Sequence, residues 1–160
     1  MLKVKNNIFL IFLLFAISIA FVIALIIQYG FGHQPCRLCV YQRIPYILSI
    51  LLLVSIFIIK KYKKITLLLL AIIFFLSFSL GFYHFGIEQG FFNELSVCGV
   101  DNFKENLTKK QLLKNLEQSA VSCKDVNFKI LGLSLATINS IFSLLLSGIF
   151  LRLFLIYGKN

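Results

Sequence analysis

The sequence has few charged residues, and long stretches of it contain none. Only 14% of the 160 residues are charged, whereas 59% are hydrophobic and the mean hydropathy is +0.93. Soluble domains carry about 25% charged and about 45–50% apolar residues. This composition excludes a soluble globular protein, and a chain of this length has room for one membrane domain.

The apolar stretches also lack the alternation of apolar and polar residues that a membrane β-barrel requires, so we expect helices. Four spans are predicted, at about residues 8–27, 42–59, 65–83 and 131–156. Each has roughly the 17 to 25 residues that a membrane helix needs, the second only if residues before Pro45 are included. The predicted fold is an all-α, four-helix transmembrane bundle that forms a single domain over residues 1–160.

No small-x-small cleavage pattern follows the first span, although Lys3 and Lys5 precede it as in a secretory signal. Its apolar stretch is also longer than the core of a typical signal peptide. We therefore expect the first span to stay attached as a membrane helix.

Acidic residues are absent from both ends of the chain and from the short turn between the second and third spans. These regions hold eight basic residues: Lys3, Lys5, Lys60, Lys61, Lys63, Lys64, Arg152 and Lys159. All six acidic residues lie between the third and fourth spans, where six lysines balance them. Because basic residues near span ends stay on the cytoplasmic side, both termini and the turn at 60–64 are predicted to be cytoplasmic, and the loops at 28–41 and 84–130 external. The formal net charge of +10 then reflects orientation and gives no argument for nucleic-acid binding.

All four cysteines fall in the predicted external loops, Cys36 and Cys39 in the first and Cys98 and Cys123 in the second. Thiols outside a bacterial inner membrane can persist as disulfides. Four cysteines allow three pairings, and counting does not choose among them. A C-x-x-C disulfide closes a very small ring and is more typical of a redox-active disulfide than of a structural one. A bond between Cys98 and Cys123 would close a longer loop and would stabilise it by about 3 kcal/mol.

Two other kinds of chemistry are disfavoured. A zinc site would need all four thiolates to converge at the membrane surface, and the second pair lacks the short spacing of a zinc knuckle. We therefore expect no metal. Nucleophilic hydrolysis is disfavoured because neither His33 nor His84 has a partner carboxylate at a telling spacing.

The segment HQPCRLCVYQRIP surrounds the first cysteine pair. A thiol is reactive as the thiolate, so something must lower its ordinary pKa of about 8.5. Arg43 lies four residues after Cys39, where the second helix begins with Pro45 in its first turn. The guanidinium and the positive end of that helix are expected to lower the thiol pKa by about two units. The alternative is that Arg43 only anchors the helix at the lipid headgroups, which is the role that we assign to Arg37. We place His33 at the membrane interface, with no part in the chemistry.

The second external loop contains two features with a predicted structure. His84 and Glu88 are four residues apart, so they share a face if the third helix continues that far. They then form either a hydrogen-bonded pair or part of a site for the polar head of a ligand. Thr108 and Gln111 match a capping box, which predicts a short interfacial helix ending near Gln118.

Four motifs are similar to those of a known family. They are PCRLCVYQRIPY at 35–46, YHFGIEQG at 83–90, SVC ending at Cys98, and SCKDVNFKILGLSLATIN at 122–139. With them the chain resembles the DsbB family, the quinone-dependent disulfide bond formation proteins of bacterial inner membranes. The similarity covers essentially the whole chain, and C-x-x-C-x-Y-Q-R together with a second cysteine pair is specific. The chain departs from many relatives in having no tryptophan after the Glu-Gln-Gly stretch.

The resemblance implies a relay of thiol–disulfide exchanges. A reduced DsbA-like oxidase of the thioredoxin fold, in the periplasm, would attack a Cys98–Cys123 disulfide at Cys98. The freed Cys123 would attack Cys36, and Cys39 would be left as a thiolate. The electrons would leave to a quinone of the membrane pool, ubiquinone or menaquinone.

The same resemblance implies the location of the protein and the residues around the quinone. The quinone would lie beside Cys39, with Arg43 stabilising the negative charge and His84 nearby. The protein would be a multi-pass inner-membrane protein, in contact with membrane lipids, with its cysteines on the periplasmic side.

Two other functions stay open. A non-catalytic four-helix scaffold would use both disulfides only to hold its loops, and Cys36→Ser would then weaken folding and leave cellular disulfide formation unchanged. A reductase of the vitamin K epoxide reductase type would run the same thiol and quinone chemistry in reverse. Its direction depends on reduction potentials, for which about 30 mV corresponds to about 1.4 kcal/mol.

Overall fold

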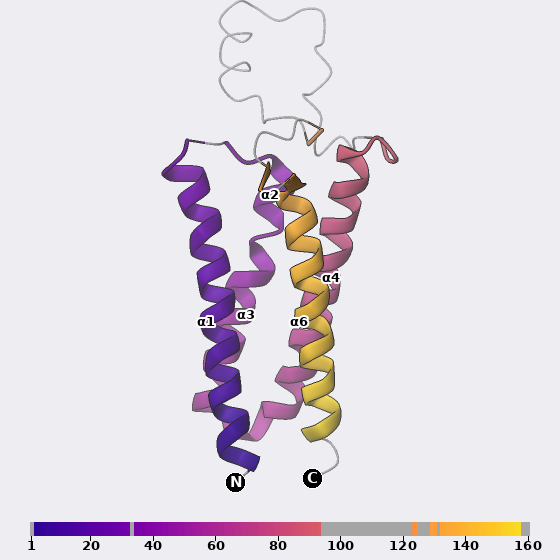
Figure 1. Ribbon diagram of the computed structural model, residues 1–160. Helices are drawn as coiled ribbons and strands as arrows, with labels where there is room; N and C mark the ends of the chain where they lie inside the picture. The colour runs from indigo at the N-terminus through magenta and orange to yellow at the C-terminus, as the bar shows by residue number, and fades with distance from the viewer. Residues whose placement is uncertain (1, 33, 94–122, 125–128, 131, 158–160) are drawn as a thin grey trace, which may run out of the picture.

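The protein is a bundle of four long helices (Figure 1). The computed structural model describes all residues except 1, 33, 94–122, 125–128, 131 and 158–160. The long helices are α1 (Leu2–Tyr29), α3 (Ile44–Ile58), α4 (Lys63–Glu88) and α6 (Leu135–Tyr157). The short elements are the helix α2 (Arg37–Tyr41), the 3-10 helix η1 (Lys60–Tyr62) and the antiparallel hairpin of β1 (Lys129–Ile130) and β2 (Leu133–Ser134).

Four helical segments are long and apolar enough to cross a membrane, which confirms the predicted fold class. They are Asn7–Tyr29, Arg37–Ile58, Lys63–Glu88 and Leu135–Tyr157. Large apolar side chains on all four are exposed on the outside of the bundle, as expected for a surface that faces lipid rather than water. The chain is therefore a multi-pass membrane protein.

The second span differs from the single helix that the sequence predicts near residues 42–59. It begins earlier, with α2, and turns at Gln42 and Arg43 before α3 continues it. Pro45 stands in the first turn of α3, where its missing N–H would have had no partner in the helix. The break allows α2 to lie at the end of the bundle with its own N-terminus and its own cap.

The other ends also shift from their predicted positions. The helix α4 continues to Glu88 rather than ending near residue 83, which brings His84 and Glu88 onto one helical face. The helix α6 begins at Leu135 rather than 131 because the preceding residues form the hairpin, whose turn contains Gly132 at φ +82°. A positive φ of this size is readily adopted by glycine.

Small and polar side chains allow α4 and α6 to approach closely. A Cβ atom on Gly81 would lie 3.1 Å from both Cα and Cβ of Ser140. The hydroxyls of Ser77 and Ser143 are hydrogen-bonded at 3.0 Å, and the Ser147 hydroxyl donates to the carbonyl oxygen of Ala71. Membrane helices associate through small residues and interhelical hydrogen bonds of this kind, so α4 and α6 form the tightest pair of the bundle.

The apolar core lies between the four helices. Phe74 of α4 stacks on Phe150 of α6, with ring centroids 5.7 Å apart, and meets Tyr46 of α3 edge-on at 5.8 Å. Residues of α1, among them Leu13 and Ile17, complete the same buried cluster. The four spans therefore share one core, consistent with a single domain.

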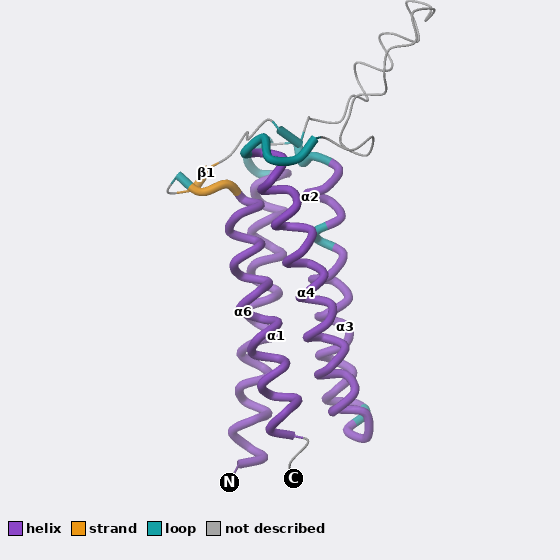
Figure 2. The backbone as a smooth tube through the Cα atoms, turned by 90° about the vertical axis from the view of Figure 1, so that its right-hand side faces the viewer, coloured by secondary structure: helices purple, strands orange, loops and turns teal. Residues whose placement is uncertain are grey.

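Both termini lie at one end of the bundle, and α2 and the hairpin lie at the other (Figures 1 and 2). At the terminal end, Lys63 Nζ donates to Asn7 Oδ1 at 3.0 Å and lies 4.8 Å from the ring centroid of Tyr157. We call the opposite end, which holds Cys36, the cysteine end. The predicted interfacial helix and Cys98 lie outside the described residues, and the assignment of the two ends to membrane sides stays a prediction.

Candidate functional site

Cys36 is the N-cap of the short helix α2. Its backbone is extended, with φ −65° and ψ 164°, and its Sγ accepts a hydrogen bond from the backbone N–H of Cys39 at 3.2 Å. A sulfur in the N-cap position faces the unpaired N–H groups of the first turn, which stabilise a negative charge there. Both cysteines of the C-x-x-C motif are free thiols, and Cys36 is only 5% exposed.

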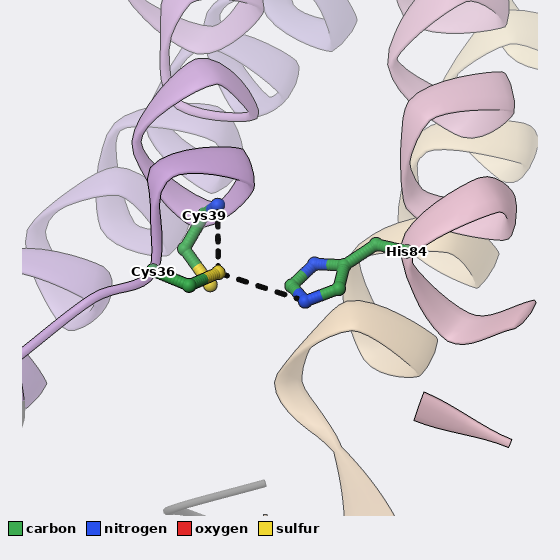
Figure 3. Close-up of side chains that lie close together, drawn as sticks. All are labelled: Cys36, Cys39 and His84. Carbon is green, nitrogen blue, oxygen red and sulfur yellow. Dashed lines mark hydrogen bonds between the residues drawn. The ribbon is translucent and has the colours of Figure 1, made fainter. Parts of the chain in front are cut away.

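His84 extends from α4 to the first cysteine pair, as Figure 3 shows. Its Nε2 lies 3.6 Å from Cys36 Sγ, and the side chain is 3% exposed. Glu88, one turn further along α4, places Oε1 3.7 Å from the same nitrogen. The sequence analysis expected this shared face if the helix continued, and the structure confirms it.

A chain of polar side chains continues from His84 into the bundle. Gln42 Nε2 lies 3.2 Å from His84 Nδ1, and Asn139 Nδ2 donates to Gln42 Oε1 at 3.0 Å. The hydroxyl of Tyr46 donates to Asn139 Oδ1. The sequence predicts no role for Gln42, Asn139 or Tyr46, although a polar side chain inside a predicted span is itself a signal of a partner or a function.

The surroundings of Cys36 favour its thiolate form. They lower the pKa of Cys36 from 9.0 to about 5. The largest cause is the hydrogen bond with the Cys39 side chain; burial opposes it, and the hydrogen bond and charge of His84 add to it. At neutral pH Cys36 is therefore a thiolate that can act as a nucleophile.

Arg43, the cation that the sequence analysis placed beside the thiols, makes its hydrogen bonds to α1. Its guanidinium donates to Gln28 Oε1 through Nη1 and to the carbonyl oxygen of Ala24 through Nη2 at 3.5 Å. It comes after Gln42, the C-cap of α2, and stands at the N-cap position of α3. Arg43 therefore links α1 to α3 next to the cysteine end.

Cys123, from the second cysteine pair, lies against the first pair. It is 2% exposed and disulfide-bonded. It belongs to one buried cluster with Cys36, Leu38 and Ile87, against which Cys39 packs. The structure therefore brings cysteines from both predicted external loops together, while Cys98 lies outside the described residues.

The arrangement can support two kinds of chemistry. A buried thiolate beside a disulfide-bonded cysteine has the components of thiol–disulfide exchange. In addition, the ligand atoms of Cys36, Cys39 and His84 all lie within 4.8 Å of one another, which is a spacing from which a metal could be bound while both thiols are reduced.

Comparisons with known proteins agree with the first of these, thiol–disulfide exchange. Residues 6–153 match the family described as "Disulfide bond formation protein DsbB". An uncharacterized protein of Rickettsia prowazekii (strain Madrid E) is 32% identical over 160 residues, an alignment that covers 99% of this chain and 90% of the relative. No solved structure matches the chain significantly.

Proposed function

Because the chain belongs to the DsbB family of disulfide bond formation proteins, we propose that it is a membrane thiol:quinone oxidoreductase. It reoxidises a reduced DsbA-like partner of the thioredoxin fold in the periplasm and passes the electrons through two cysteine pairs to a quinone. Family membership implies a role in disulfide bond formation; the partner, the path and the acceptor are our proposal.

The observation that carries the proposal is the contact between the two cysteine pairs. Cys123 is disulfide-bonded and lies in the same buried cluster as the Cys36 thiol. Exchange requires a thiolate close to a disulfide sulfur, and its rate rises as the pKa of the leaving thiol falls. The pKa of about 5 for Cys36 makes Cys36 a good leaving group when a thiol of the second pair attacks a disulfide that contains it.

The proposed exchange balances in thiols and disulfides. Cys36 and Cys39 are the free thiols, so we assign Cys98 as the partner of Cys123. A thiolate of the reduced partner protein attacks Cys98, which forms a mixed disulfide and releases Cys123 as a thiolate. Cys123 then attacks Cys36 of an oxidised C-x-x-C pair, and Cys39 leaves as a thiolate.

The second thiol of the partner protein resolves the mixed disulfide, so the partner leaves oxidised and Cys98 is released as a thiolate. Cys98 then attacks Cys123 of the Cys36–Cys123 disulfide, which restores the Cys98–Cys123 bond and releases Cys36 as a thiolate. The two electrons are then held by the reduced Cys36 and Cys39. His84, hydrogen-bonded with Cys36, stabilises the thiolate that Cys36 becomes when it leaves. Burial of the site keeps water from the sulfurs while the exchange proceeds.

The side chains at the cysteine end match the needs of a quinone headgroup. Its carbonyl oxygens require N–H donors at the outer edge of the apolar region, and the guanidinium of Arg43 provides such donors. When bound, a quinone supplies an acceptor for two electrons and two protons. We assign Arg43, His84 and Cys39 to this site; the hydrogen bonds of Arg43 to Gln28 and Ala24 hold its guanidinium between α1 and α3.

The proposal is tested with the purified full-length protein in detergent micelles. A reduced thioredoxin-fold oxidase is mixed with it, and reduction of ubiquinone and menaquinone analogues is followed by absorbance. We expect steady electron transfer that is lost in Cys36→Ala, and a trapped mixed disulfide through Cys98 in Cys123→Ala. Ser79→Ala, on an exposed position of α4, is the matched control and should keep full activity. A protein with four intact cysteines that reduces neither quinone would refute the proposal.

A further inference from the structure

Glu88 is a buried carboxylate, and one of its oxygens has no hydrogen-bond partner in the described part of the chain. Its side chain is 6% exposed. Its Oε2 has no hydrogen-bond partner among the described residues, and its Oε1 faces His84 Nε2 at 3.7 Å. A buried carboxylate without full pairing is unfavourable unless a cation accompanies it. The side chain therefore points to a positively charged ligand at this place.

Three side chains that can bind metal form a group next to Glu88, which contacts it through His84. The sulfurs of Cys36 and Cys39 and a ring nitrogen of His84 lie within 4.8 Å of one another, with 3.6 Å between Cys36 Sγ and His84 Nε2. In a tetrahedral zinc site with bonds of about 2.0–2.3 Å, neighbouring ligand atoms are about 3.3–3.8 Å apart. Figure 3 shows the imidazole ring of His84 facing the Cys36 sulfur, with the Cys39 sulfur next to it. A contraction of at most about 1 Å would bring these three ligand atoms to that spacing, and Glu88 Oε1, at 3.7 Å from His84 Nε2, would turn toward them as the fourth ligand.

We propose that Cys36, Cys39, His84 and Glu88 bind one thiophilic divalent cation of the zinc class when both cysteines are reduced. Two thiolates and an imidazole suit such a cation better than they suit magnesium or calcium, and the carboxylate completes a tetrahedral set. Binding displaces the proton that the Cys39 thiol carries, forms four coordinate bonds and transfers no electrons. Because a disulfide has no thiolate to offer, oxidation of the pair releases the metal.

The inference differs from the zinc site that the sequence analysis disfavoured. That site needed all four cysteines, whereas Cys123 is disulfide-bonded in the structure and is not a ligand here. His84 and Glu88 take the places of the second pair. Neither could be assigned as a ligand from spacing alone, because 48 residues of sequence separate Cys36 from His84.

Gln42 provides the support that a metal-bound imidazole requires. A histidine that binds metal through Nε2 carries its proton on Nδ1 and donates it to a neighbouring oxygen. Gln42 already faces His84 Nδ1 at 3.2 Å, and a half-turn of its carboxamide places Oε1 there, because the two ends of the group have nearly the same shape. Asn139, which contacts Gln42, can turn in the same way.

The test uses cobalt, because zinc has no visible spectrum. The full-length protein with Cys98→Ser and Cys123→Ser is reduced in detergent micelles without oxygen and titrated with Co²⁺. We expect one Co²⁺ per chain with thiolate-to-metal charge-transfer bands and tetrahedral d–d bands, displacement by equimolar Zn²⁺, and loss of the spectrum when the pair is oxidised. His84→Ala and the isosteric Glu88→Gln should each weaken binding at least about tenfold. His33→Ala, at the other histidine of the chain, should leave the affinity unchanged.

Several results would overturn the four-ligand assignment. They are Co²⁺ binding without thiolate charge transfer, binding that survives oxidation, and unchanged affinity in either His84→Ala or Glu88→Gln. The inference rests on the proposed function only for its consequence, which is that Zn²⁺ slows quinone reduction by the wild-type protein and a chelator restores it. Cobalt binding in a protein that transfers no electrons would support the metal site and remove only the proposed function.

Discussion

Replacing His84 tests whether its imidazole keeps Cys36 in the thiolate form. In the wild type the pKa of Cys36 is about 5, so the reactive thiolate persists from neutral pH down to that value and is lost as the pH falls through it. His84→Ala removes the contact between Nε2 and Cys36 Sγ at 3.6 Å. A hydrogen bond to a charged group contributes about 1.5–3 kcal/mol, which corresponds to about one to two pKa units. We therefore expect the midpoint to rise to roughly pH 6–7.

Alkylation with iodoacetamide measures this midpoint directly, because only the thiolate reacts. The protein with Cys98→Ser and Cys123→Ser leaves Cys36 and Cys39 as its reactive thiols, and mass spectrometry of the labelled peptides separates their rates. Cys39→Ala should raise the midpoint of Cys36 further than His84→Ala does, because the hydrogen bond with Cys39 is the largest cause of the lowered pKa.

Two results would contradict this reasoning. One is an unchanged midpoint in His84→Ala, which would mean that the imidazole does not interact with the sulfur in the membrane-embedded protein. The other is a rise in Cys39→Ala smaller than that in His84→Ala, which would reverse the order of the two causes. Ser79→Ala, exposed on α4, is the control for handling in detergent and should titrate as the wild type does.

Three further substitutions test the packing and the polar contacts. Gly81→Leu should lower the free energy of unfolding by about 1–3 kcal/mol, because even its Cβ would meet Ser140 at 3.1 Å. The control Gly148→Leu, with nothing within 4 Å of its Cβ position, should not lower it. Thermal denaturation followed by circular dichroism compares the two variants. Gln42→Leu breaks hydrogen bonds to the buried His84 and the half-buried Asn139. It should lower stability by about 1–3 kcal/mol for each group left unpaired, whereas equal melting temperatures would show that neither bond contributes. Arg43→Lys cannot reproduce the two-pronged contact with α1 and should raise the KM for quinone in steady-state assays, and an unchanged KM would remove Arg43 from the quinone site.

The four spans could be predicted from the sequence because apolar length alone determines which segments can cross a membrane. The end of α4 could not, since residues 84–88 mix polar and apolar side chains and only the complete helix shows that Glu88 follows His84 on one face. The division of the second span into α2 and α3 could not be predicted from the sequence either. Hydropathy averages over the turn at Gln42 and Arg43, whereas the structure places a separate helix cap at Cys36.

The site was predictable only in part, because its polar partners come from distant parts of the chain. The C-x-x-C motif can be recognised from the sequence because its residues are close together. The contact between Gln42 and Asn139 cannot, because 97 residues separate them. Spacing therefore carries no information on their contact. Arg43 shows the converse: its position near Cys39 in the sequence suggested a partner for the thiols, and its hydrogen bonds go to α1 instead. Neighbours in sequence at a helix start can point in different directions around the axis.

The polar chain from Tyr46 to Cys36 accounts for the way in which an imidazole can be held against a sulfur in an apolar bundle. Each member is paired with the next: Tyr46 donates to Asn139, Asn139 donates to Gln42, and Gln42 contacts His84 Nδ1. In this direction Gln42 donates to Nδ1, so the ring proton stays on Nε2 and faces the Cys36 sulfur at 3.6 Å. Unpaired polar groups inside a membrane are unfavourable, so these four side chains are stable there because each is hydrogen-bonded to the next. The tight packing of α4 on α6 keeps His84 and Asn139 in the positions that these links require, and the geometry around the thiol therefore depends on the helix pair behind it.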